Sequence, residues 1–146
     1  MCKHEGFVSA DHTADLALRI WAADLEGVYR QAALGLGDLL ADGTEVRPSL
    51  ERAVEVRGID REELLVAWLN EILYFFESEG ILLSRIDTLI LHHEGAEYRL
   101  EASITGEKRD PERHGRPAAV KAATYHNLDL EPDARGTYEL TIVLDT

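Results

Sequence analysis

Apolar and polar residues alternate in several short segments of this chain, and this period-two pattern restricts the folds that the chain can adopt. Every second side chain is apolar in residues 98–104 and again in residues 138–144. Shorter stretches of the same kind occupy residues 16–20 and 54–57, and residues 86–91 form a β-branched and leucine-rich run. Alternation of this kind is typical of strands with one buried and one wet face, so it predicts a mainly antiparallel or mixed sheet.

Two amphipathic helices interrupt these strands. The first follows Asp24, which is a good N-cap residue, and is expected to end at Asp42-Gly43. The second follows Asp60, has Glu63 three residues on as in a capping box, and is expected to end at Gly80. Apolar side chains recur at helical spacing along both segments, so each helix has a face to bury.

The size of the chain limits the architecture further. A chain of 146 residues, 45% of them hydrophobic, is expected to form one domain spanning residues 1–146. We therefore predict an α+β fold, a two-layer single domain in which both helices pack on one face of the sheet. No apolar run approaches the ~20 residues of a membrane span, and the first residues lack a secretory apolar core. Cys2 is the single cysteine. A cytoplasmic protein without membrane contact, disulfide or cysteine zinc site is expected.

The charge of the chain indicates what it binds. Lysine and arginine number 15 against 28 aspartate and glutamate, a formal net charge of −13. Because binding to a phosphate backbone requires clustered basic side chains, no direct nucleic-acid binding is expected. An acidic surface suits a basic protein partner or cations, although solubility alone would also explain it.

Three clusters carry the residues suited to chemistry. Asp11 to Asp15, which includes His12, could ligate a hard cation or could simply form a turn. In Val120 to His126, a strand would place Lys121 and Tyr125 on one face and His126 on the other. There Lys121 could serve as a general acid or an anion anchor, or could be a solvated strand lysine.

The third cluster is the end of the sequence, where Asp145 precedes Thr146 with its α-carboxylate. It is a compact group of oxygen ligands or a frayed terminus. Residues 107–119, with two prolines and many charges, read as a long loop. The sequence contains no glycine-rich phosphate loop, no nucleophile elbow and no zinc-protease motif.

With these residues in view, the whole chain resembles the archease family. Six matches occur in the family's order, and together they are far more specific than any one of them. They are His12-Thr13-Ala14-Asp15; Leu25-Glu26 with Ala32–Leu36; Leu64-Leu65 with Trp68–Glu71 and Leu73-Tyr74; Gly106-Glu107 with His114; Val120–His126; and the final strand with Asp145.

The resemblance implies an accessory role in tRNA splicing or RNA repair. Archeases assist the RtcB-type, GTP-dependent RNA ligase, promoting its guanylylation and multiple turnover, and do no covalent chemistry themselves. The family's metal site maps to Asp15, Asp145 and Thr146, and its functional lysine to Lys121. The implied cofactor is a divalent cation, calcium first, with magnesium or manganese as alternatives. Thr146 departs from the hydrophobic residue that is usual there.

Two other functions remain open at this stage. Some archeases are described as chaperone-like modulators of a tRNA methyltransferase, which would make such an enzyme the partner. The chain could also be a small metal-dependent enzyme that uses Asp15, His12, Lys121 and His126, with Tyr125 nearby. The first alternative predicts that the metal ligands are dispensable, and the second predicts turnover without a partner.

Overall fold

The computed structural model describes residues 5–12, 15–125 and 128–146, without the side chains of residues 10–12 and 15. It contains two antiparallel sheets and two helices, which confirms the α+β class. The four-stranded sheet has the order β1-β2-β7-β6, and the three-stranded sheet has the order β3-β5-β4. The strands are β1 (Gly6–His12), β2 (Asp15–Ala22), β3 (Leu50–Gly58), β4 (Ile81–Glu94), β5 (Glu97–Lys108), β6 (Ala122–Ala123) and β7 (Tyr138–Asp145).

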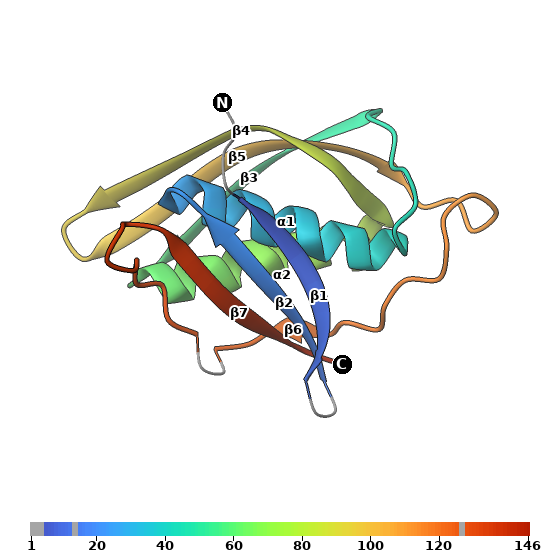
Figure 1. Cartoon of the computed structure of the whole chain (residues 1–146). Coiled ribbons are helices and arrows are strands. Elements are labelled where there is room, and N and C mark those ends of the chain that lie inside the picture. Colours follow the sequence, from blue (N-terminus) through green and yellow to red (C-terminus); the bar gives the residue numbers. More distant parts are fainter. Residues whose placement is uncertain (1–4, 13–14, 126–127) are drawn as a thin grey trace.

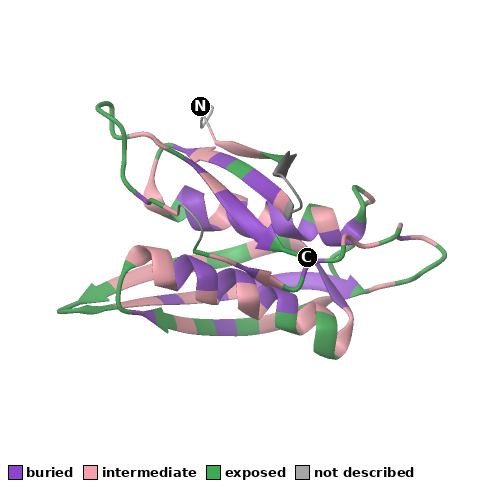
Figure 2. Cartoon of the chain, turned by 90° about the horizontal axis from the view of Figure 1, so that it is seen from below, coloured by how far each residue is buried: buried purple, intermediate pink, exposed green. Residues whose placement is uncertain are grey.

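The helices lie between the two sheets, whereas sequence patterning suggested two layers with a single sheet (Figure 1). Helix α1 (Leu25–Ala41) contacts β2 of one sheet and β4 of the other, and α2 (Arg61–Glu79) contacts β3 and β6. Alternation tells which face of a strand is buried but not which strand is its neighbour, so it could not separate two sheets from one. Buried positions run along the helices and the strands that face them (Figure 2).

Both helices begin and end where the sequence predicted. The Asp24 carboxylate accepts a hydrogen bond from the Gly27 N–H at 2.8 Å, and the Asp60 carboxylate accepts one from the Glu63 N–H at 2.7 Å. Asp42 and Gly80, both with positive φ, close the two helices. These caps satisfy backbone groups that a helix leaves unpaired at its ends, so local sequence alone defines the helix limits.

A buried hydrogen-bonded link joins the two helices inside the core. The Trp68 indole N–H donates to the Tyr29 carbonyl oxygen at 2.8 Å, and the Tyr29 hydroxyl donates to the Arg61 carbonyl oxygen at 2.8 Å. Burial raises the pKa of Tyr29, and the Glu62 charge adds to that rise. The hydroxyl therefore stays protonated and able to donate. Neither helix in the described part of the chain is long and apolar enough to cross a membrane.

Candidate functional site

The strand register brings two of the predicted acidic positions to the same end of the four-stranded sheet. In the antiparallel pair of β2 and β7, Leu16 lies opposite Leu144. Asp15, the first residue of β2, and Asp145, the last of β7, therefore extend the two strands at this shared end. His12, the last residue of β1, pairs with Asp15 in the ladder between β1 and β2. The side chains of His12 and Asp15 fall outside the described residues, so only their backbone positions are assigned.

Lys121 comes to the same sheet end from a distant part of the sequence. Its backbone N–H donates to the Asp145 carbonyl oxygen at 2.7 Å, and Ala122 pairs with Asp145 in the β6–β7 ladder. Lys121, Asp145 and Thr146 are all exposed. The three sequence clusters therefore meet at one accessible end of the sheet, which we call the sheet end.

Tyr125 departs from the sequence prediction. Of the possible strand over residues 120–126, only the two residues of β6 form one, and the Leu128 N–H donates to the Tyr125 carbonyl oxygen at 3.0 Å. Partial burial raises the pKa of the Tyr125 phenol, and the charges of Glu63 and Asp60 raise it further. The charges that act on the Tyr125 phenol thus lie at the start of α2. His126 lies outside the described residues.

The sheet end offers oxygen atoms, the ligands that hard cations prefer. Asp145, at the end of β7, and Thr146, which follows it, come to the same end of the sheet as the backbone of Asp15 at the start of β2. Among the side chains that the structure describes, no three from His, Cys, Asp and Glu gather closely enough to hold a metal. The predicted trio depends on the Asp15 side chain, so the metal site remains a prediction.

The loop that leads to Lys121 is held by a buried polar cluster that sequence reasoning did not foresee. His114 is fully buried, and its Nε2 lies 3.0 Å from a Glu107 carboxylate oxygen. His114 Nδ1 accepts the Asp110 N–H at 2.8 Å, so the ring is neutral with its proton on Nε2, which donates to Glu107. The one sequence signal for this contact was that Gly106-Glu107 and His114 together form one of the six matches to the family pattern.

Glu107 collects three donors in that cluster. They are the Arg113 guanidinium, the Arg47 backbone N–H at 2.8 Å and the His114 imidazole. Burial alone would raise the pKa of Glu107, but these hydrogen bonds outweigh burial and bring the pKa down to about 2. The carboxylate is therefore ionised and anchors the loop at neutral pH.

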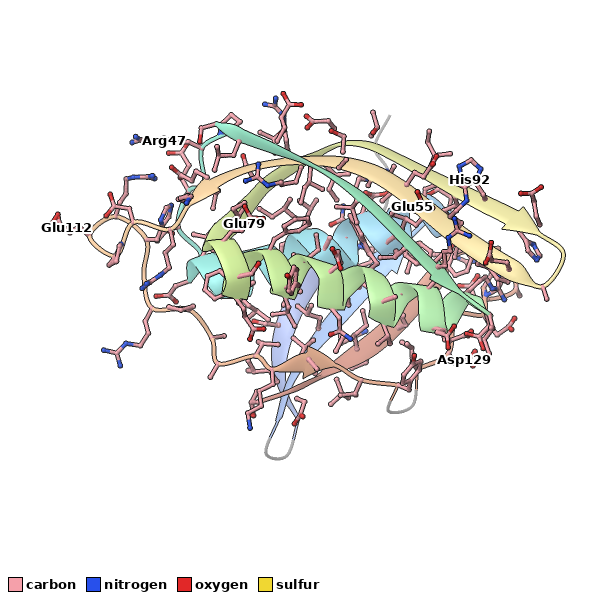
Figure 3. All side chains as sticks on the ribbon, turned by 180° about the vertical axis from the view of Figure 1, so that it is seen from behind. Arg47, Glu55, Glu79, His92, Glu112 and Asp129 are labelled. Carbon is pink, nitrogen blue, oxygen red and sulfur yellow. The ribbon has the colours of Figure 1, made fainter. Side chains whose placement is uncertain are left out.

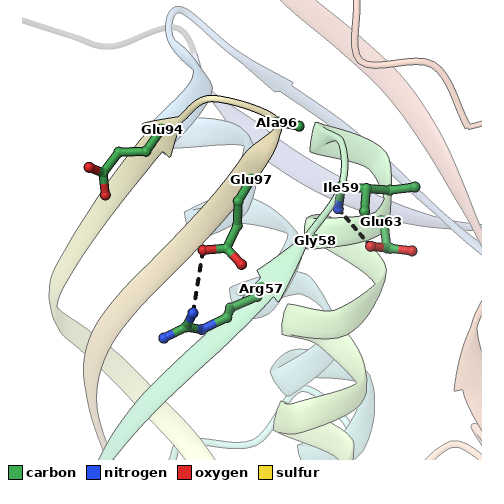
Figure 4. A pocket seen from close by; sticks show the side chains of 7 residues that line it. All are labelled: Arg57, Gly58, Ile59, Glu63, Glu94, Ala96 and Glu97. Carbon is green, nitrogen blue, oxygen red and sulfur yellow. Dashed lines mark hydrogen bonds and ion pairs between the residues drawn. The ribbon is translucent and has the colours of Figure 1, made fainter.

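A separate cavity of about 440 Å³ lies at the end of β3, between the β4–β5 hairpin and the start of α2 (Figure 4). Four of its lining residues already pair with one another, since Arg57 pairs with Glu97 at 3.3 Å and the Ile59 N–H donates to Glu63 at 2.7 Å. No residue of the sheet end lines it. It is therefore a poor candidate for the predicted chemistry.

Fold and site define a class of small α+β proteins in which two antiparallel sheets enclose two helices and the final strand ends in an exposed aspartate. The chain belongs to the archease protein family (MTH1598/TM1083), whose family model matches residues 7–146. The archease of Methanosarcina mazei is 35% identical over 135 residues, 92% of each chain. That of Methanopyrus kandleri is 38% identical over 135 residues, 92% of this chain and 96% of its own.

A solved structure shares the fold. The solution structure of Methanobacterium thermoautotrophicum protein 1598 superposes with a TM-score of 0.80 at 31% identity, covering 97% of this chain and 99% of that one. The resemblance found in the sequence is thus confirmed at the level of family and fold.

Proposed function

We propose that this chain is a non-catalytic accessory protein of an RtcB-type GTP-dependent RNA ligase, and that it promotes guanylylation and multiple turnover of that ligase. The observation that carries the proposal is the meeting of Asp15, Asp145 and Lys121 at the sheet end. These positions come from three separate parts of the sequence. Family membership supports the role, because the resemblance assigns function to these same positions.

The charge of the chain supports a protein partner. A net charge of −13 favours docking on a basic, RNA-handling enzyme and disfavours direct binding to RNA. Lys121 is bonded to Asp145 through the backbone, and its exposed side chain adds one positive charge to this end of the sheet. In the proposed complex the exposed sheet end faces the nucleotide site of the ligase, where Lys121 contacts phosphate or a ligase carboxylate.

The chain's own residues fit a hard divalent cation. Asp15, Asp145 and the backbone oxygens of Thr146 would hold it, with calcium first and magnesium or manganese as alternatives. When bound, such a cation supplies positive charge that neutralises the carboxylates and orients phosphate oxygens. Asp145 is held in place through its own carbonyl oxygen, which accepts the Lys121 N–H, so its side chain is left available for ligation.

The test is a ligation time course with limiting RtcB-type ligase, GTP and divalent metal, with and without this protein. We expect product beyond one turnover only when the protein is present. Asp15→Asn, Asp145→Asn and Lys121→Ala should each lose most of that stimulation. Glu112→Gln is the matched control, because it removes a charge from an exposed loop residue that projects away from the helices (Figure 3).

Each contrary outcome would point to a different function. Full stimulation by the Asp15 and Asp145 variants would refute the metal-site mechanism. If wild-type protein leaves the ligase unchanged but keeps a tRNA methyltransferase soluble, the chaperone role replaces the ligase role. Turnover of a substrate by this chain alone would establish an enzyme.

A further inference from the structure

Asn70 reaches from the middle of α2 to the edge of the four-stranded sheet. Its side-chain Oδ1 accepts a hydrogen bond from the Ala123 backbone N–H at 2.9 Å. Ala123 belongs to β6, which is the last strand of the sheet and has only two residues. The Asn70 amide therefore stands where a further strand would supply the carbonyl partner.

This contact holds β6 from the side opposite to β7. On the β7 side, the N–H groups of Lys121 and Thr124 donate to the carbonyl oxygens of Asp145 and Val143, at 2.7 Å and 3.1 Å. A two-residue strand has too few ladder bonds to fix its own position. Bonds on both edges fix β6 between α2 and β7, so Asn70 completes the support of the sheet end.

The packing of α2 holds the backbone of Asn70 in place. Its neighbours Trp68 and Leu69 are fully buried, and Ile72 and Leu73 are buried one turn on. Asparagine is a weak helix former, because its amide competes for backbone hydrogen bonds, so an interior position carries a local cost. The Ala123 contact is a tertiary interaction that offsets this cost.

We propose that Asn70 is a positioning residue, which holds β6 against β7 and so sets the place of Lys121 beside Asp145. Among the described residues, the Asn70 side chain bonds to the Ala123 backbone N–H, so Asn70 acts on the sheet end through the backbone of β6. The effect on ligase stimulation rests on the function proposed above, whereas the effect on β6 does not.

Two substitutions separate this role from general stability. Asn70→Ala removes the acceptor but favours the helix, so the protein should still fold. Asn70→Asp keeps an oxygen at the same reach and should retain the bond to the Ala123 N–H. Ser78→Ala is the matched control, because Ser78 also makes one side chain–backbone hydrogen bond on α2, to the Tyr74 carbonyl oxygen at 2.6 Å.

The first measurement is residue-resolved amide hydrogen exchange of the full chain. In Asn70→Ala, the Lys121 and Ala123 amides should exchange about fivefold faster or more, as expected for loss of one net hydrogen bond. Asn70→Asp and Ser78→Ala should leave the Lys121 amide at the wild-type rate. Unchanged Lys121 exchange in Asn70→Ala would overturn the proposal, whatever the ligase does.

The second measurement is ligase stimulation across a range of concentrations of each variant. Asn70→Ala should reduce stimulation about tenfold, comparable to loss of an outer-shell partner of a metal ligand, and Asn70→Asp should restore it. If Asp145→Asn abolishes stimulation and Asn70→Ala leaves it intact, the positioning role is wrong while the proposed function stands. If neither variant changes stimulation, the metal-site mechanism fails, and hydrogen exchange alone decides whether Asn70 holds β6.

Discussion

Replacing His114 by alanine should destabilise the protein far more than replacing the chemically similar His92. Both imidazoles lie 3.0 Å from a glutamate oxygen, Glu107 for His114 and Glu101 for His92. The two pairs differ in burial. The side chains of His114 and Glu107 are 0% and 11% exposed, against 33% and 44% for His92 and Glu101.

The expected cost follows from what each substitution leaves behind. His114→Ala opens a cavity and removes partners from Glu107 and from the Asp110 N–H. The buried Glu107 carboxylate loses one of its donors and the part-buried Asp110 N–H loses its acceptor. Together with the cavity these losses should cost about 3 kcal/mol, less where water enters. His92→Ala breaks a half-exposed pair and should cost about 0.5 kcal/mol or less.

Urea unfolding at pH 7 measures both free energies of unfolding, and calorimetry gives the shift in Tm. A loss of about 3 kcal/mol corresponds to a fall of roughly 6–12 °C for a chain of this size. Equal losses in the two variants would refute the reasoning, because burial would then not determine the strength of the pair. A cost below about 0.5 kcal/mol for His114→Ala would refute it as well.

Two further predictions concern the same anchor. The depressed pKa of Glu107, about 2 against an ordinary 4.5, means that its stabilising contribution is complete above pH 4.5 and is lost as pH falls towards 2. The free energy of unfolding measured across this range should therefore fall less steeply in Glu107→Gln than in wild type. Gly106→Ala should cost about 2 kcal/mol or more in urea unfolding, because the added Cβ would lie 1.9 Å from the Leu82 carbonyl oxygen. Gly95→Ala is its control, with open space around the Cβ and a strained positive φ that costs about 1 kcal/mol, and a smaller loss at Gly106 would contradict the steric argument.

The sequence predicted those parts of the fold that depend on neighbouring residues. Helix limits followed from Asp24, Asp60 and Gly80, because capping is a local interaction. Strand β4 extends on both sides of the β-branched and leucine-rich run predicted over residues 86–91, and register shifts at Leu83/Arg85 and Ile86/Thr88 break the period-two pattern in its first half. Strand β1 was missed, because its residues, GFVSADH, give a weak apolar pattern.

Sequence reasoning could identify residues of the candidate site but not how they come together. The types and positions of Asp145 and Lys121 were visible in the chain, and the resemblance singled them out. Their proximity depends on β6 pairing with β7, and β6 is also hydrogen-bonded to Asn70, more than fifty residues earlier. No local pattern encodes such a contact, and only residues 122–123 of the possible strand over residues 120–126 form one.

The chain between β5 and β7 has little regular structure of its own, yet it places the candidate functional lysine. Backbone N–H groups along it donate to acceptors on earlier elements, in the pairs Ala118–Leu39, Ala123–Asn70 and Leu130–Glu62. Lys121 lies between the bonds of Ala118 and Ala123, which attach to different helices. Its position is therefore set by α1 and α2 together with β7, rather than by its own segment. Because Lys121 itself is exposed, its side chain remains open to a partner while its backbone is fixed, which is the arrangement that docking at the sheet end requires.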